Sequence, residues 1–251
     1  MTQPASPALH FSGNVFLNIS GTGLIGPIDV SSLQIKPDAD KRTLSSKMNG
    51  QYGNARQTYY LGKPAQITIK TTDIPPTLLA PAFMGAEVAI NQASGSLTDE
   101  TVTLPAYPGW AKLSKGNLSS TGFSVKKTST ALPEEDYEVN YALGLLRASE
   151  SGSLKAGGAV TVTATYNAIS GTRIKGNVKP FVTAALLMDG QNLVDGRAMH
   201  LEIPSCTLSP SSELDFLSEN AIEVTLAGEL QIKSGEDAAF YVDFPEPVAA
   251  P

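Results

Sequence analysis

The chain has 251 residues and a formal net charge of −6, and 41% of its residues are hydrophobic. Only 17% of the residues are charged and acids outnumber bases, which argues against a protein that binds nucleic acid through a basic surface. The chain is interrupted by 22 Gly and 17 Pro, which disfavours long helices and favours many short strands.

Cysteine content and hydropathy exclude further classes. Cys206 is the only cysteine, so neither an intramolecular disulfide framework nor a thiolate zinc site is possible. No apolar run reaches the roughly 18 residues that a membrane-spanning helix needs. The opening residues MTQPASPALHFSG lack the basic and apolar regions of a signal peptide. We therefore expect a protein made and kept in a reducing cytoplasm, or exported by a route that needs no such peptide.

The first third of the chain predicts strands around one long connection. We expect residues 1–12 to form a flexible arm. Apolar alternation predicts strands over 14–20, 28–36 and 65–72, and a slip in the alternation of 28–36 predicts a β-bulge. Residues 37–64 have little apolar periodicity, so we expect a long polar loop there. Loops of such length are often functional or ordered by a partner.

One short helix is predicted, over Pro75–Met84. Asp73 is the candidate N-cap residue, and prolines follow where the first turn of a helix tolerates them. Gly85 then ends the segment. The rest of the chain predicts strands over 86–90, 101–104, 122–127, 137–146, 159–168, 173–188, 200–203, 213–217 and 221–232, followed by a loose tail over 245–251.

The strand over 159–168 carries the strongest signal, because Val160, Val162 and Ala164 alternate with threonines. The predicted fold is mainly β, an antiparallel β-sandwich or partial barrel with one short flanking α-helix. We expect a single domain over 13–244. A Gly/Pro-rich stretch near 105–109 would suit an inserted module over 106–170, but no clear second linker follows, so the single domain is favoured.

Motifs for catalysis are weak. Residues 21–26 match the GxGxxG dinucleotide pattern, but Pro27 and a strand-like segment follow where that motif requires a helix. A glycine-rich connection between strands is favoured. His10 and His200 lack visible partners for a catalytic base, and a thiol–base pair of Cys206 with His200 is less favoured than a small buried thiol.

Acidic residues offer little more. Asp189, Asn192 and Asp195 could supply oxygen ligands to Ca²⁺, but two Asp-Gly turns explain the same residues. Glycoside hydrolysis by carboxylates would need aromatic sugar platforms, and only 7% of the residues are aromatic. We expect no enzyme activity, no cofactor and no metal.

The composition instead favours a building block that uses its surface in subunit contacts. Charged residues are depleted at the centres of interfaces, whereas Tyr, Met and Arg are enriched there. The stretch KMNGQYGNARQTYY contains such residues, and the candidates for contacts between subunits or rings are Met48, Tyr52, Arg56, Tyr59 and Tyr60.

The order of features resembles the major tail (tail tube) proteins of long, non-contractile-tailed bacteriophages. A strand with a Gly-rich turn leads to VSSLQIK, the polar stretch MNGQYGNARQ and the strand–helix segment ITIKTTDIPPTLLAPAFMGA. The hairpin DYEVNYALGLL…GGAVTVTATYNA, the most telling part, and GTRIKGNVKPFVTAALLMDGQNLVDG follow. The resemblance covers residues 13–232.

This resemblance implies a structural virion protein without catalytic residues. Six copies would form a ring, with strands from each closing one barrel, and stacked rings would form a tube through which DNA and a tape-measure protein pass. Tail-tip and terminator proteins would be further partners. The protein would be made in the bacterial cytoplasm and reside in the virion tail, with residues 37–64 bridging subunits or rings.

Two further expectations concern the surface. Glu134, Glu135 and Asp136 are candidate acids of the tube lumen or of a solvated loop, because acids around a channel would repel DNA. The alternative function is a carbohydrate- or cell-surface-binding β module, in which Trp110 or Tyr107 would contact the glycan.

Overall fold

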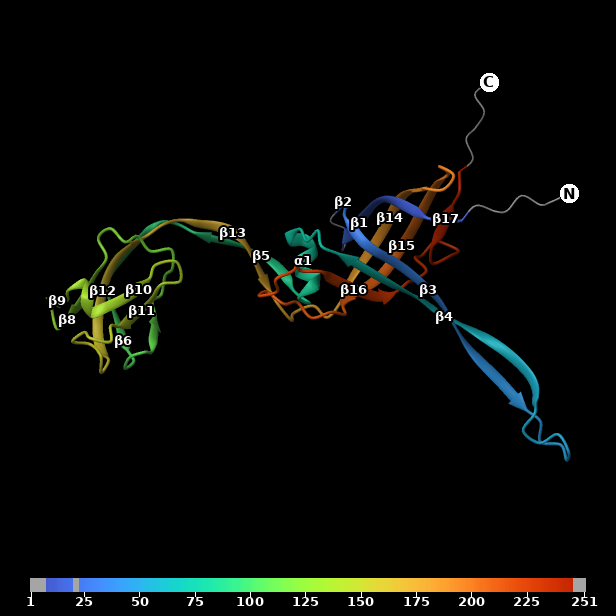
Figure 1. Ribbon diagram of the computed structural model, residues 1–251, viewed down its shortest axis with the longest axis horizontal. Coiled ribbons are helices and arrows are strands. Elements are labelled where there is room, and N and C mark those ends of the chain that lie inside the picture. The colour runs from blue at the N-terminus through green and yellow to red at the C-terminus, as the bar shows by residue number, and fades with distance from the viewer. Residues whose placement is uncertain (1–7, 20–22, 246–251) are drawn as a thin grey trace, which may run out of the picture. The chain divides into compact units, whose positions relative to one another are not determined.

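The computed structural model describes residues 8–19 and 23–245 (Figure 1). Most of the arm expected over 1–12 and of the tail expected over 245–251 lies outside these residues. The described chain is mainly antiparallel β with one short α-helix, as the sequence predicts. The helix is α1 (Pro76–Ala82), and the strands are β1 (Phe11–Ile19), β2 (Leu24–Ile28), β3 (Val30–Ser45), β4 (Ala55–Thr71), β5 (Ala86–Gln92), β6 (Gly95–Leu104), β7 (Trp110–Lys112), β8 (Ser124–Lys127), β9 (Thr130–Ala131), β10 (Tyr137–Asn140), β11 (Leu145–Ala148), β12 (Gly158–Tyr166), β13 (Ile169–Lys175), β14 (Val182–Asn192), β15 (Ala198–Pro210), β16 (Val224–Glu229) and β17 (Tyr241–Asp243).

The chain forms two compact units. Unit 1 comprises Met1–Glu87 and Ile174–Pro251, and unit 2 comprises Val88–Arg173. The region expected as a single domain, 13–244, is thus divided into two units. Unit 2 contains the alternative inserted module of 106–170 and is longer than it at both ends. The chain passes between the units through β5 and β13, which form a two-stranded sheet. A paired ribbon needs no Gly/Pro-rich linker, which is why composition did not mark the boundary.

Unit 1 is a curled antiparallel sheet with the strand order β2-β1-β14-β15-β16-β4-β3, and β17 pairs with β15. Strands β2 and β3 stand at the two ends of this order, yet the single residue Asp29 joins them. The sheet must therefore curl until its two ends meet at this corner. Among the described residues no hydrogen-bonded ladder joins β2 to β3, so the result is a partial barrel.

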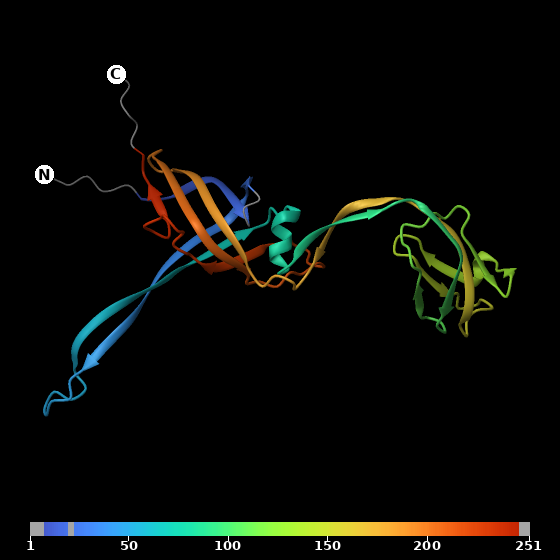
Figure 2. The ribbon, with the colours of Figure 1, turned by 180° about the vertical axis from the view of Figure 1, so that it is seen from behind.

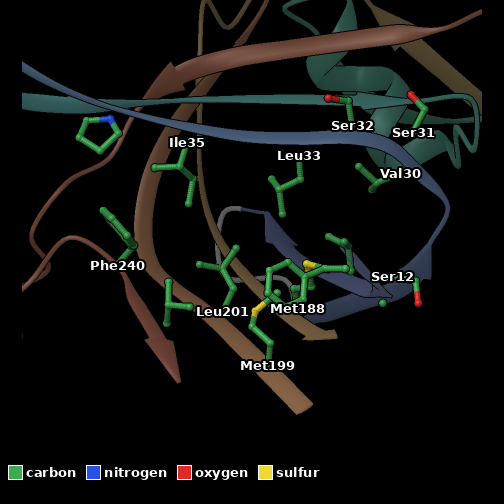
Figure 3. A pocket seen from close by; sticks show the side chains of 15 residues that line it. Ser12, Val30, Ser31, Ser32, Leu33, Ile35, Met188, Met199, Leu201 and Phe240 are labelled. Atoms are coloured by element: carbon green, nitrogen blue, oxygen red, sulfur yellow. The ribbon is translucent and has the colours of Figure 1, made fainter. Parts of the chain in front are cut away.

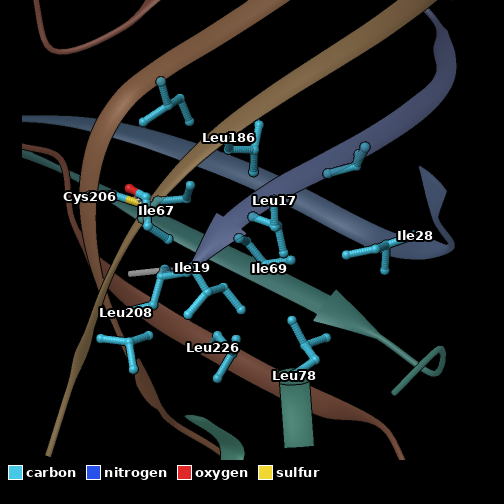
Figure 4. Close-up of a cluster of buried hydrophobic side chains, with 14 of the residues drawn as sticks. Leu17, Ile19, Ile28, Ile67, Ile69, Leu78, Leu186, Cys206, Leu208 and Leu226 are labelled. Atoms are coloured by element: carbon cyan, nitrogen blue, oxygen red, sulfur yellow. Dashed lines mark hydrogen bonds between the residues drawn. The ribbon is translucent and has the colours of Figure 1, made fainter. Parts of the chain in front are cut away.

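The core of unit 1 lies inside this curl. Leu17, Ile67, Leu186 and Ile203 are fully buried there, and Leu78 of α1 closes one side (Figure 4). The helix begins at Pro76 with Pro75 as its N-cap, so the expected cap at Asp73 is wrong. Register shifts at Val30/Ser32 and Lys36/Asp38 confirm the bulged character of the predicted strand over 28–36.

Unit 2 packs two small sheets around a core of its own. One sheet has the order β10-β11-β7 and the other β6-β12-β8-β9. Val160, Val162 and Ala164 of β12 all point into this core, as their alternation with threonine predicts. The segment expected as a strand over 137–146 forms two strands, β10 and β11, which pair with each other. The hairpin expected between this segment and GGAVTVTATYNA is wrong, because β12 pairs with β6 and β8 in the other sheet.

Two expectations for unit 1 are wrong. Residues 37–64 are not an irregular loop, because β3 and β4 pair across almost all of them. Most of their side chains are exposed, on both faces of the ribbon, and those that are not are polar, so pairing leaves no period-two apolar pattern in the sequence. Residues 213–217 were expected to form a strand, but 211–223 form an irregular connection between β15 and β16.

Candidate assembly surfaces

The first candidate surface is the projecting hairpin, defined as residues 36–64 of β3 and β4. The neighbouring residues Ile35 and Ala65 still pack on the core, but every side chain from Lys47 to Pro64 is exposed. Figure 1 and Figure 2 show this part of the hairpin extending past the rest of unit 1, at the end of β4 away from α1. The ribbon therefore has no hydrophobic layer from its own chain.

The tip of the projecting hairpin, residues 46–54, is an ordered turn. The backbone N–H of Ser46 donates to the carbonyl of Asn54 at 2.7 Å, and the N–H of Gly53 donates to the carbonyl of Ser46 at 2.9 Å. Ser46 itself is buried within the turn. The tip thus presents its outward side chains from a defined backbone.

All five candidate contact residues lie on this hairpin. Met48 and Tyr52 occupy the tip, whereas Arg56, Tyr59 and Tyr60 lie on β4. Tyr52 is 80% exposed and Tyr60 is 65% exposed. Since successive residues of a strand point to opposite faces, Tyr59 and Tyr60 place an aromatic ring on each face of the ribbon. Both faces therefore offer apolar surface to a partner.

The second candidate surface is an apolar groove of about 530 Å³ in unit 1, lined by residues of β1, β3, β14, β15 and β17 and by Phe240. Leu33 and Ile35 of β3 form one side, and Met199, Leu201 and Phe240 lie across from them (Figure 3). These residues come from segments far apart in the chain. No sequence motif unites these residues, so the groove could not be predicted from the sequence.

The outer edges of β2 and β3 are the third candidate surface. Each strand has a ladder partner on one side, β1 for β2 and β4 for β3, and within the described residues none on the other. Unpaired edges expose backbone N–H and C=O groups that can pair with another chain.

The candidate acids Glu134, Glu135 and Asp136 form a 3₁₀ turn in unit 2. Asp136 accepts hydrogen bonds from the Ser153 hydroxyl at 2.5 Å and from the Ser153 N–H at 3.0 Å. These bonds hold the pKa of Asp136 below its usual range. Asp136 thus ties two loops together, while Glu134 and Glu135 are exposed.

Unit 2 also carries a row of planar side chains across β10, β11 and β7. Pairing places Glu138 beside Arg147 and Arg147 beside Trp110 on one face of the sheet. The Arg147 guanidinium lies 2.6 Å from the Glu138 carboxylate, 4.6 Å from the Trp110 ring and 5.3 Å from the Tyr107 ring. Tyr107 and Trp110 were candidates from the sequence, whereas Glu138 and Arg147 carry no local signal, because only strand pairing brings them to the two rings.

The structure gives no support to a thiol–base pair of Cys206 with His200. The thiol of Cys206 is buried and donates to the Ala184 carbonyl at 3.3 Å, and burial raises its pKa to about 11. His200 instead lies on the exposed face, with Nε2 3.5 Å from Asp189 Oδ1. A thiol with so high a pKa carries almost no thiolate near neutral pH.

The cofactor and metal patterns are also explained by the fold. Residues 20–22 lie outside the described residues, but β2 follows at Leu24, so the helix required by a dinucleotide site is replaced by a strand. Asp195 is engaged by the Asn192 amide and the Arg197 guanidinium, each at 2.7 Å. In the described part of the chain, no three His, Cys, Asp or Glu side chains group to hold a metal ion.

The described geometry defines a protein of two antiparallel β units joined by a strand pair. The chain belongs to the family described as protein of unknown function UCP028589, whose model matches residues 9–238. The match spans both units. A search of curated proteins found no match. No helix in the described ranges is long and apolar enough to cross a membrane.

Proposed function

We propose that this protein is a structural subunit that assembles with identical copies into hexameric rings, stacked as the tail tube of a long, non-contractile bacteriophage tail. The observation that carries the proposal is the projecting hairpin. A two-stranded ribbon is marginally stable alone in water, and this one exposes Met48, Tyr52 and Tyr60. Burial against another copy would remove these side chains from water.

The unfinished sheet of unit 1 supports the same proposal. Its end strands β2 and β3 each keep one unpaired edge in the described chain, and closure with neighbouring copies would pair them. A paired hairpin stands where the resemblance to tail-tube proteins implied a long polar loop, and the short helix α1 follows it as that resemblance implies.

The charge distribution supports a conduit for DNA. Unit 2 has seven acidic and seven basic side chains, so unit 1 carries the whole net charge of −6. Acids facing a lumen would repel DNA and let it slide. In this proposal the DNA and a tape-measure protein pass through the tube, tail-tip and terminator proteins cap it, and the protein resides in the virion after synthesis in the bacterial cytoplasm.

Negative-stain electron microscopy of the concentrated protein tests the proposal. We expect rings or tubes from the full chain, alone or after addition of a tail-tip nucleus. A matched variant replaces residues 41–60 with Asn-Gly, which suits a two-residue turn between the paired residues Asp40 and Leu61. This variant should fold and remain monomeric. A full chain that stays monomeric under all these conditions, or a shortened chain that assembles equally well, would overturn the proposal.

A second candidate function rests on the row of planar side chains in unit 2, which consists of Glu138, Arg147, Trp110 and Tyr107. We propose as the alternative that this row binds a carbohydrate of a cell surface, with Trp110 stacking on the sugar and Arg147 and Glu138 bonding its hydroxyls. Trp110 is 41% exposed and is the only tryptophan, so its fluorescence reports on this site alone. Glycans should shift the emission of the full chain and of a Tyr52→Ala control, and Tyr107→Ala should weaken the response. An unchanged emission across a glycan panel would exclude this alternative.

A further inference from the structure

Unit 1 is divided into two regions of opposite charge. The projecting hairpin has six basic and two acidic side chains, a net charge of +4. The remaining residues of unit 1 have fifteen acidic and five basic side chains, a net charge of −10. A basic, aromatic ribbon therefore extends from an acidic body.

The cations of the hairpin are largely unsatisfied by their own chain. Arg42 pairs with Asp40 at 2.8 Å. Lys47 in the tip and Arg56 just beyond it on β4 form no ion pair within the described residues. Since exposed charges on one ribbon remain available to a partner, the outer hairpin, defined as residues 46–60, combines positive charge with the exposed rings of Tyr52 and Tyr60.

The connection 211–223, called here the β15–β16 loop, has the complementary character. It holds four acidic residues and no basic one: Glu213, Asp215, Glu219 and Glu223. Of these four acids, only Glu223 forms an ion pair within the described residues, with Lys70 at 3.5 Å. The loop also exposes two large apolar side chains, Phe216 at 67% and Leu217 at 93%.

The β15–β16 loop is anchored on unit 1. Leu214 packs on the core, and the Phe216 ring stacks on the Phe83 ring at the end of α1, with 5.6 Å between centroids. The Ser211 N–H donates to the Thr225 carbonyl at 2.9 Å. The loop therefore presents Leu217 and its acids from a fixed position beside α1.

The hairpin tip and the β15–β16 loop cannot meet within one copy. Strand β4 leads from the tip to α1 over 17 residues, which corresponds to roughly 55 Å of extended chain. The two surfaces thus lie at opposite ends of β4, and two different patches that fit one another join copies head to tail. Such heterologous contacts produce rings when the rotation closes and filaments when it does not.

We propose that the outer hairpin of one copy docks on the β15–β16 loop of a second copy. Tyr52 and Tyr60 pack against Leu217 and Phe216, while Lys47 and Arg56 face Asp215 and Glu219. This inference rests on the proposed self-assembly and names the surface that receives the hairpin. The two positive charges of the hairpin and the two negative charges of the loop favour this head-to-tail orientation over contacts between like surfaces. Salt screens these charges, so the contact should be weaker at high ionic strength.

Charge reversal tests the docking. One variant carries Lys47→Glu and Arg56→Glu in the outer hairpin, and a second carries Asp215→Lys and Glu219→Lys in the β15–β16 loop. Each alone should lower the assembled fraction at least tenfold at low salt, measured by light scattering and electron microscopy, because like charges then face each other. An equimolar mixture of the two should assemble, since the outer hairpin of each variant fits the loop of the other.

Controls separate this inference from the proposed function. Glu134→Lys with Glu135→Lys reverses two exposed acids of unit 2 and should leave assembly unchanged, and circular dichroism confirms folding of every variant. If the wild-type chain assembles and both reversed variants assemble equally well, the docking is wrong and the proposed function stands. If the variants fail alone and in mixture, the charge pairing is wrong. A wild-type chain that never assembles overturns both.

Discussion

Unit 1 and unit 2 both leave strand edges unpaired within the described residues, but they differ in the surfaces that they offer to a partner. Unit 2 packs two sheets of short strands on its own core and has equal numbers of acids and bases. Unit 1 has a larger core but leaves two edges unpaired within the described chain, extends a bare hairpin and carries all the net charge. The difference teaches that the surfaces suited to contacts between copies, the bare hairpin and the net charge, concentrate in unit 1.

The largest expected effect tests whether the two cores are separate. Leu186→Ala in unit 1 and Leu146→Ala in unit 2 each remove a fully buried side chain and should each cost about 2–5 kcal/mol of unfolding free energy. Trp110 fluorescence reports unfolding of unit 2, and thiol labelling of Cys206 reports unfolding of unit 1. Each substitution should shift the unfolding transition that is reported by the probe in its own unit and leave the other transition unchanged. A shift of both probes by either variant would mean that the units unfold as one.

A pair of glycines contrasts the packed body of unit 1 with its hairpin. A Cβ at Gly228 would overlap the Thr207 carbonyl oxygen where β16 meets β15, so Gly228→Ala should cost about 1–3 kcal/mol. A Cβ at Gly62 would meet nothing within 4 Å, so Gly62→Ala should cost no stability. Denaturant titration of both variants measures the contrast, and equal losses would show that the hairpin is packed in the monomer.

The thiol of Cys206 should make unit 1 sensitive to alkali. Burial raises its pKa to about 11, above the value near 8.5–9 of an unfolded thiol. The stability contributed by the neutral thiol is complete below about pH 8.5 and is lost as the pH rises through 11. The loss should approach about 1.4 kcal/mol for each unit of pKa difference. Unfolding free energies of wild type and Cys206→Ala between pH 7.5 and 10.5 measure it, and parallel curves would contradict it.

The smallest expected effect makes unit 2 sensitive to acid. Ser153 holds the pKa of Asp136 below its usual range, so the carboxylate contributes stability above its unfolded pKa of about 3.9. That contribution is lost as the pH falls through the folded pKa. Asp136→Asn should lower the melting temperature of unit 2 at pH 7. The difference in melting temperature between this variant and wild type should become smaller as the solution is made more acidic. Glu135→Gln, an exposed neighbour, is the control.

Much of the fold was predictable because burial leaves a pattern. Val160, Val162 and Ala164 face one core, and their alternation predicted the strand that contains them. The helix was predicted from prolines and a short apolar run, which α1 confirms to within a few residues. The candidate contact residues were chosen by type, and the structure places all five on the exposed hairpin.

The failures have two causes: some segments do not bury the side chains that their sequence pattern suggests, and some partner residues lie far apart in the chain. Residues 37–64 pair as strands without an apolar face, so periodicity predicted a loop. The β15–β16 loop has the apolar spacing of a strand at 213–217, but Phe216 and Leu217 are exposed and no strand pairs with them. Arg147 reaches Trp110 only because β11 lies beside β7.

The amino-acid sequence by itself determined the mainly β class, the single short helix and the acidic balance of the chain, because composition and local alternation follow from nearest neighbours along the backbone. Only the tertiary structure decided that the chain forms two units, that 36–64 is a bare hairpin and that the basic tip and the acidic loop lie at opposite ends of β4. These features depend on which strands pair across long stretches of chain, and pairing energy is spread over contacts that no local pattern encodes.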